Sequence, residues 1–148
     1  MRNRVKITEV TADHIKRVNM VMDFVERNLE RELSLNSLSV KANYSPYHFH
    51  RVFLKITGET LNSFIIRKRI EKIASILTVG TDESFSDLAF KYGFSSGNAF
   101  SRAFKKFYGV NPREFKEKFS KIGVEVLTYD KYICRINNIK DAKDEYKY

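Results

Sequence analysis

The sequence predicts an all-α fold of about seven helices: two helix-turn-helix subdomains joined by a long linker helix, followed by a short C-terminal tail with a β-like pattern. Two observations lead to this prediction. Apolar residues, mostly phenylalanine, recur at helical spacing in residues 49–56 and 100–107, and each stretch follows a turn signal and a serine and ends at a glycine. Between them, residues 60–78 contain neither proline nor glycine.

The composition describes a basic, globular chain. Its 148 residues are 43% hydrophobic and include 12 phenylalanines and 8 tyrosines, enough to form a core. The net charge of +9 attracts polyanions, with nucleic acid as the first candidate and an anionic membrane surface as the second. No apolar run approaches the ~18 residues of a membrane span, and the N-terminus lacks a signal peptide's apolar segment. We therefore expect a cytoplasmic protein with no membrane partner.

The first two predicted helices lie in residues 11–43. Thr11 or Asp13 can cap the first, which should end near Arg31. Ser34 can cap the second, which closes at Asn43, a residue type that tolerates the left-handed conformation of a tight turn. The positions expected to face the core are Ile15, Val18, Met22, Val25, Leu29, Leu35, Leu38 and Ala42.

A third helix begins at once, and the linker helix follows it. Ser45 is its expected cap, Pro46 takes the first helical position, and Gly58 ends it. The linker helix covers residues 60–78. The expected core positions are Phe49, Val52, Phe53 and Ile56 in the third helix, and Leu61, Phe64, Ile66, Ile70, Ile73 and Leu77 in the linker.

The second half predicts three more helices. Ser84 can cap a short one that ends at Gly93, and Ser95 or Ser96 can cap the next. An Asn-Pro-x-Glu sequence at residues 111–114 then starts a final helix. The expected core positions are Phe85, Leu88, Ala89, Phe100, Phe104, Phe107, Phe115 and Phe119.

The two halves repeat one another. An offset of 50 relates Leu35, Leu38, Asn43, Tyr44 and Ser45 to Phe85, Leu88, Gly93, Phe94 and Ser95. After one inserted residue, an offset of 51 relates Phe49, Arg51, Phe53, Lys55 and Gly58 to Phe100, Arg102, Phe104, Lys106 and Gly109. Each half is therefore helix, tight turn, helix, a unit that can present its second helix to a DNA groove.

The outward faces of the two second helices carry the candidate DNA-binding residues. Side chains able to bond base edges are Tyr47, His50 and Arg51 in the first unit and Asn98, Ser101 and Arg102 in the second. Those expected to meet phosphate are Lys55, Lys105 and Lys106, together with the capping serines Ser45, Ser95 and Ser96 at helix starts. Two alternatives stay open: Tyr47 as a partly buried staple beside the turn, and Arg51 and Arg102 as solvated surface arginines.

The length of the linker helix suggests how the two units share one duplex. At ~1.5 Å per residue the helix spans roughly 28 Å, close to the ~34 Å of one DNA turn. One chain could then read two successive major-groove segments as a monomer. Because the two outward faces differ, the predicted site is asymmetric, and a spacing shorter than the groove repeat would bend the DNA at a cost on the order of 1 to 6 kcal/mol.

The two units and the helix between them resemble a known family. The pattern G-F-x5-F-x3-F-K-K-x2-G-x-N-P, residues 93–112, looks like the DNA-binding domain of AraC/XylS-type transcription regulators, and the resemblance runs from about Val18 to Phe119. The first unit, S-P-Y-H-F-H-R-V-F followed by T-G-E-T-L, resembles the branch in which a GyrI-like effector domain comes second. The resemblance implies RNA polymerase as a partner, and base-reading roles for Tyr47, His50, Arg51, Gly97, Asn98, Ser101 and Arg102. Gly97 departs from the long polar residue of some members.

Other site classes are not expected. The serines occupy capping positions, no G-x-S-x-G or phosphate-binding loop occurs, and the acidic residues are scattered, so we predict a non-enzyme without a cofactor. His48 and His50 are two apart on a helix and point in different directions, and Cys134 is the only cysteine, so no metal site is expected.

These patterns give a DNA-binding domain, residues 1–120, and a C-terminal extension, residues 121–148. Within the first we assign the first helix-turn-helix unit to 11–58, the linker helix to 60–78 and the second unit to 84–119. In the extension, V-E-V-L-T-Y and K-Y-I-C-R-I read as a strand pair. It is either the start of an effector domain that this chain lacks, or a short extension that docks on the helical body.

Three functions remain to be distinguished. The first is a sequence-specific binder of double-stranded DNA that regulates transcription. The second is a non-specific or architectural nucleic-acid binder, which gives the two outward faces no reason to differ. The third is a helical interaction module for an acidic protein, which predicts no salt-linked DNA affinity.

Overall fold

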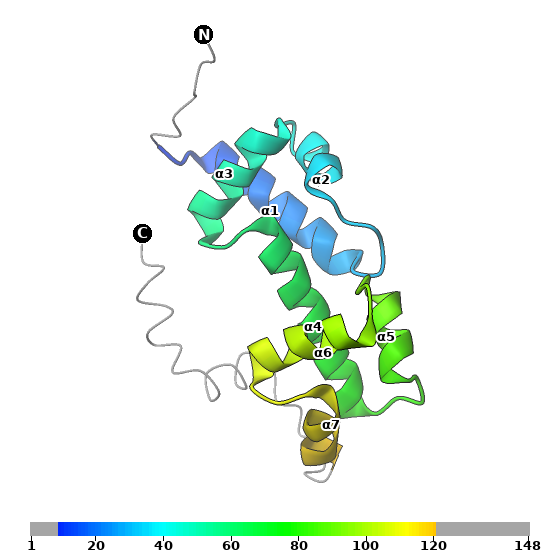
Figure 1. The fold of residues 1–148 in the computed structure, drawn as a ribbon. Coiled ribbons are helices and arrows are strands. Elements are labelled where there is room, and N and C mark those ends of the chain that lie inside the picture. Colours follow the sequence, from blue (N-terminus) through cyan, green and yellow to red (C-terminus); the bar gives the residue numbers. More distant parts are fainter. Residues whose placement is uncertain (1–8, 121–148) are drawn as a thin grey trace. The chain divides into compact units, whose positions relative to one another are not determined.

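The computed structural model describes residues 9–120, and the regular secondary structure within them is all α-helix (Figure 1). The helices are α1 (Ala12–Arg27), α2 (Leu35–Lys41), α3 (Pro46–Thr57), α4 (Leu61–Val79), α5 (Phe85–Lys91), α6 (Gly97–Tyr108) and α7 (Pro112–Ser120). The predicted all-α class, with its linker helix, is confirmed. The predicted strand pair and Cys134 lie outside the described residues.

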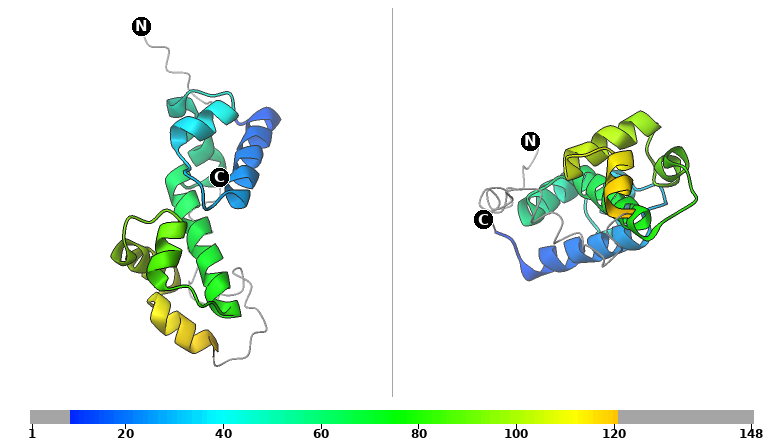
Figure 2. Two further views of the ribbon diagram at one scale, coloured as in Figure 1. Left: turned by 90° about the vertical axis from the view of Figure 1, so that its right-hand side faces the viewer. Right: turned by 90° about the horizontal axis from the view of Figure 1, so that it is seen from below.

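The chain separates into two units whose boundary falls inside α4, between Ile65 and Ile66. The first unit holds α1, α2, α3 and the first part of α4. The second holds the rest of α4 with α5, α6 and α7. Within the first unit α3 packs against α1 and α2 (Figure 1), and within the second α6 packs against α5 and α7 (Figure 2).

Each unit has its own aromatic and aliphatic core. In the first, the fully buried Val21 and Val25 of α1 lie in one core with Phe49 and Phe53 of α3. Phe53 also meets Phe64 of α4, with ring centroids 5.6 Å apart. The second core is built from Ile70, Ile73, Leu77, Leu88, Phe100 and Phe104, all buried. The rings of Phe104 and Phe115 lie edge to face with centroids 5.1 Å apart, and this contact packs α7 against α6.

Eight positions expected to face the core are not fully buried, and one helix ends earlier than expected. Ile15 is exposed, and the other seven are half-buried: Met22, Leu35, Ile56, Ile66, Phe85, Phe107 and Phe119. Ile15 is 43% exposed, because the buried stripe of α1 is centred on Val21 and Val25 and Ile15 lies roughly 90° from its centre. Phe107 is only half-buried. Its neighbour Tyr108 is buried instead, since α7 brings Phe115 to within 5.1 Å of that ring. The first helix ends at Arg27 rather than near Arg31. The next residue, Asn28, caps it by donating from its side-chain amide to the Phe24 carbonyl.

The internal repeat is present in the structure. Helices α2 and α5 begin and end at an offset of 50, and α3 and α6 at an offset of 51. The repeat also extends one helix further back than the sequence comparison suggested. At an offset of 52, Val18, Val21 and Val25 of α1 match Ile70, Ile73 and Leu77 of α4, all buried. Each repeat is thus a three-helix unit, and α4 serves as the first helix of the second one.

Both turns between the paired helices have the same hydrogen-bonded form. In the first, the Tyr44 amide donates to the Ser39 carbonyl at 2.9 Å, and in the second the Phe94 amide donates to the Ala89 carbonyl at 2.9 Å. The residue before each donor takes a left-handed conformation, Asn43 at φ 58° and Gly93 at φ 79°. This is the Schellman arrangement, in which a left-handed residue returns the chain to the last carbonyls of the helix.

Candidate nucleic-acid interface

The start and the end of α3 and α6 are set by the same local chemistry. The Ser45 hydroxyl accepts from the His48 amide at 3.3 Å, and the Ser96 hydroxyl accepts from the Ala99 amide at 3.0 Å. Gly58 and Gly109 end the two helices in left-handed conformations. Of the two serines proposed as caps for the second helix, the structure selects Ser96.

The outward face of α3 brings two predicted base-reading residues together. Tyr47 is 65% exposed, which argues against its alternative placement as a partly buried staple beside the turn. Arg51 donates from Nη1 to the Tyr47 hydroxyl at 3.2 Å, and its guanidinium carbon lies 5.6 Å from the Tyr47 ring centroid. This contact between residues four apart orients the Arg51 guanidinium along the exposed face.

His50 lies at the edge of this face. It is half-buried and lines a surface groove of about 410 Å³, together with Leu33 and Ser34 before α2 and with Thr60 and Leu61 at the start of α4. His50, the third predicted base-reading residue of α3, therefore lines a groove, whereas Tyr47 is largely exposed to solvent.

The outward face of α6 is polar and cationic. Asn98, Arg102, Lys105 and Lys106 are exposed, and Ser101 is half-buried beside them. The basic side chains of α4 are arranged differently, since Arg67 pairs with Glu71 at 2.8 Å and Lys68 lies 3.5 Å from the same carboxylate. No carboxylate of the described residues forms a salt bridge with Arg102, Lys105 or Lys106, so their charge is available to an external anion.

The remaining predicted phosphate contacts lie at helix ends. Lys55 is exposed in the last turn of α3. Ser45 and Ser95 are exposed, and Ser96 is half-buried as the cap of α6. The amides of a helix's first turn have no intrahelical acceptor and carry a partial positive charge, so the chain at these serines suits a phosphate oxygen.

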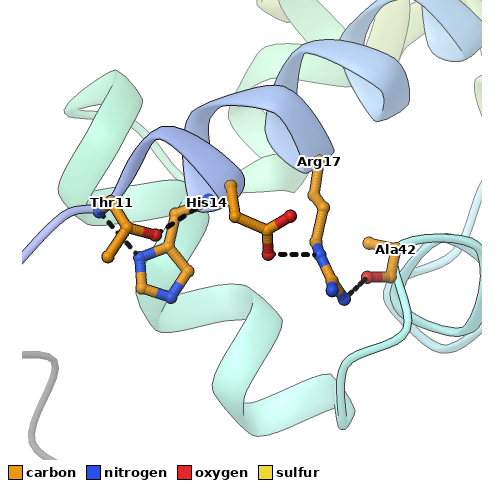
Figure 3. A network of polar contacts seen from close by, with 5 residues as sticks. Thr11, His14, Arg17 and Ala42 are labelled. Atoms are coloured by element: carbon orange, nitrogen blue, oxygen red, sulfur yellow. Dashed lines mark hydrogen bonds and ion pairs between the residues drawn. The ribbon is translucent and has the colours of Figure 1, made fainter.

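A polar network ties α1 to the first turn (Figure 3). The His14 backbone amide donates to the Thr11 hydroxyl at 3.3 Å, and the Thr11 amide donates to His14 Nδ1 at 3.1 Å. Asp13 pairs with Arg17 at 2.8 Å, and Arg17 Nη1 donates to the Ala42 carbonyl at 3.0 Å. The Thr11–His14 bonds cap α1, and Arg17 ties α1 to the end of α2, beside the turn from which α3 departs.

Tyr44 fills the space beside this turn that had been considered for Tyr47. The Arg17 guanidinium lies 5.1 Å from its ring centroid, and the His48 ring meets it at 4.9 Å. Its hydroxyl is buried without a hydrogen-bond partner among the described residues. Burial raises the pKa of Tyr44; the nearby Arg17 opposes this rise and Asp13 adds to it.

Arg69 holds the equivalent place in the second unit. It follows Arg17 at the repeat offset of 52, and its guanidinium lies against the turn at Gly93. A Cβ added to Gly93 would lie 2.7 Å from Arg69 Nη1 and 3.0 Å from Cζ. Burial lowers the pKa of Arg69. The repeat that the sequence analysis identifies begins at the second helix of each unit, so it does not include this pair of arginines.

Neither a metal-binding cluster nor a membrane-spanning helix occurs in residues 9–120. That segment contains no group of three histidine, cysteine or acidic residues that could hold a metal ion. His48, one of the two histidines considered for metal, instead packs against Tyr44 and lies 6.5 Å from His14. None of the helices in the described range is long and apolar enough to cross a membrane.

Comparison with known proteins places this architecture in a family. The sequence model described as "Helix-turn-helix domain" matches residues 38–118. The multiple antibiotic resistance protein MarA of Escherichia coli (strain K12) is 34% identical over 99 residues, which cover 67% of this chain and 77% of MarA.

Solved structures share the fold. An AraC-type transcriptional regulator from Chromobacterium violaceum superposes with a TM-score of 0.68 at 22% identity, over 76% of this chain and 100% of the regulator. The DNA-binding domain of AdpA, determined in complex with a target DNA, superposes with a TM-score of 0.65 at 22% identity, over 72% of this chain and 96% of AdpA's. The matched span, the identity to MarA and the two helix-turn-helix units together show that this chain belongs to the AraC/XylS family of transcription regulators and carries its DNA-binding domain.

Proposed function

We propose that α3 and α6 enter two successive major-groove segments on one face of a DNA duplex, and that one chain reads a single asymmetric site. The observation that carries this proposal is the three-helix repeat: two units with the same turn and the same capping present second helices with different outward side chains. A recognition helix in each of two adjacent grooves is the docking geometry that such paired units favour.

The outward side chains of the two helices suit different bases. Arg51 and Arg102 can each bond a guanine edge in the bidentate manner that arginine favours, and Asn98 can pair with adenine in the same way. Tyr47, His50 and Ser101 complete the two reading faces. Lys55, Lys105 and Lys106 bind phosphate, as do the helix starts at Ser45, Ser95 and Ser96.

In this proposal α4, which begins in the first unit and is the first helix of the second, sets the spacing of the two recognition helices. Its 19 residues correspond to roughly 28 Å of helix, against the ~34 Å between successive major-groove segments. If the two recognition helices stand closer than one turn, the DNA bends toward the protein, at a cost on the order of 1 to 6 kcal/mol that the second set of contacts repays.

Family membership supports double-stranded DNA as the partner, and AdpA, which shares the fold, was determined with its target DNA. Because one chain carries both reading units, it binds as a monomer, and the bound regulator acts on RNA polymerase at promoters.

Selection of binding sites from random duplexes at near-physiological salt tests whether the chain recognises one asymmetric sequence. We expect one asymmetric motif of about two turns. Affinity without any motif, or a palindromic motif bound by two chains, would contradict the proposal.

Two substitutions on α6 separate base reading from phosphate binding. Arg102→Ala should cost about 1 to 3 kcal/mol on the selected site and relax preference at one or two base pairs, because it removes a bidentate base contact. Lys106→Ala should weaken all sequences equally and reduce the salt slope by about 1. Titrations on selected and scrambled duplexes measure both. An equal loss on the two duplexes for Arg102→Ala would refute its base-reading role.

The RNA polymerase contact needs its own measurement. A duplex carrying the selected site next to a promoter should retain more polymerase when the protein is bound, or less if the protein blocks it. A polymerase occupancy that does not change when the site is filled would rule out this part of the proposal.

A further inference from the structure

The reading face of α3 contains a fourth residue, Leu54, that the proposed function leaves without a role. Leu54 is 40% exposed, although leucine is among the residue types most often buried. Turning about 100° per residue, it lies about 20° from Tyr47 around the axis of α3, on the side away from the buried phenylalanines. Tyr47, His50, Arg51 and Leu54 therefore form one strip along the helix.

Isolated exposed leucines are common on protein surfaces, so exposure alone decides nothing. The position in the strip is more informative. Recognition helices of homeodomains contact DNA from four positions with this same spacing, of which the last lies seven residues after the first. Leu54 is the last of the four in α3 and offers only apolar atoms there.

The internal repeat sharpens the comparison. At the offset of 51, Leu54 corresponds to Lys105 of α6, which is exposed on the equivalent face. The same place on the two helices thus holds an ammonium group in one unit and an isobutyl group in the other. A lysine there serves a phosphate, whereas a leucine gains nothing from phosphate and is stabilised only by an apolar partner.

The major groove offers one apolar feature, the C5-methyl group of thymine. Tyr47 and Arg51 contact each other, since Arg51 donates to the Tyr47 hydroxyl. Leu54 is the member of the strip whose apolar side chain makes no such contact with another predicted base-reading residue. We infer that Leu54 is a specificity-determining residue that packs against a thymine methyl group in the half-site read by α3. This inference rests on the proposed function of α3 as a recognition helix.

Replacing each thymine of the selected duplex by deoxyuridine, one at a time, tests it, because deoxyuridine keeps the base pair and lacks only the methyl. At one or two positions, all in one half of the site, the dissociation constant should rise about fourfold, the equivalent of one buried methyl group. Leu54→Ala should bind the thymine and deoxyuridine duplexes with equal affinity at those positions. Val40→Ala, which removes an apolar side chain 72% exposed on α2 and outside the strip, should keep the fourfold difference.

Leu54→Lys installs the residue that the second unit has at this place and gives a readout beyond affinity. It should lose the deoxyuridine effect, and the slope of log K against log salt should become more negative by about 1, since one more phosphate is neutralised. Lys105→Ala should make the slope less negative by a similar amount and keep the deoxyuridine effect.

The outcomes separate this inference from the proposed function. If deoxyuridine is harmless at every position of a site that is still selected as an asymmetric motif, or if Leu54→Ala leaves the fourfold difference intact, the role of Leu54 is wrong and the proposed function stands. If no motif is selected, both are overturned.

Discussion

Gly93→Ala is the substitution for which the structure gives the most detailed expectation. Gly93 sits at φ 79° in the turn between α5 and α6, a conformation that costs a residue with a Cβ ~1 to 2 kcal/mol. The added methyl would also lie 2.7 Å from Arg69 Nη1, closer than such atoms approach. The guanidinium must therefore move from its place against the turn, which adds about 1 kcal/mol of coupling between the two sites.

The expected total is a loss of about 2 to 3 kcal/mol in the free energy of unfolding, or roughly 10 °C in melting temperature. Urea unfolding followed by circular dichroism at 222 nm measures it. The repeat supplies a matched control: Asn43→Ala at the equivalent turn position, φ 58°, removes only the residue type that tolerates this backbone and should cost about 1 kcal/mol.

A double-mutant cycle isolates the contact. In an Arg69→Ala background the methyl of Gly93→Ala has no guanidinium to displace, so its cost should fall to the backbone strain of ~1 to 2 kcal/mol. A cost for Gly93→Ala below ~0.5 kcal/mol, the usual limit of additivity, would refute the expected strain at this turn. A cost of the same size with and without Arg69 would refute the contact between the added methyl and the guanidinium.

Two further predictions concern single hydrogen-bonding groups. Ser96→Ala should lower the free energy of unfolding by about 1 kcal/mol and Ser95→Ala by less than about 0.5, because only Ser96 accepts from an amide of α6; equal losses would contradict the assignment of the cap. Tyr44→Phe should leave stability at pH 7 unchanged or raise it by about 1 kcal/mol, since the hydroxyl is buried without a partner among the described residues. Because burial raises the folded pKa of Tyr44, the wild type should lose stability as the pH rises above the ordinary tyrosine value of about 10, and the variant should lack this loss; parallel urea midpoints for both proteins from pH 7 to 10.5 would contradict it.

The local features of the fold could be predicted from sequence because each depends on a few adjacent residues. A serine before a proline, as at Ser45, satisfies amides that the helix leaves without partners. Asn43 and Gly93 are residue types that accept the left-handed turn. These signals placed the helix starts and both turns correctly without any knowledge of packing.

The details that depend on packing could not be predicted in this way. Spacing alone made Phe107 as good a core residue as Phe104, and only the position of α7 places Tyr108 inside instead. The contact of Arg17 with the Ala42 carbonyl joins residues 25 apart, which no local pattern reports. The site was predictable as two exposed faces, whereas the hydrogen bond between Arg51 and Tyr47 required side-chain positions.

The single residue inserted between the two halves decides which side chains of α6 correspond to the predicted base-reading residues of α3. Had the offset of 50 continued beyond the turn, Tyr47 would match Gly97 and Arg51 would match Ser101, so the second face would lack both an arginine and an amide at those places. The structure puts the insertion at Ser95, because Ser96 is the residue that caps α6 as Ser45 caps α3. From the cap onward the offset is 51, Asn98 matches Tyr47, and Arg102 matches Arg51. Gly97, which departs from the long polar residue of some family members, therefore corresponds to Pro46, the first residue of α3, and Asn98 is the residue of α6 that corresponds to Tyr47.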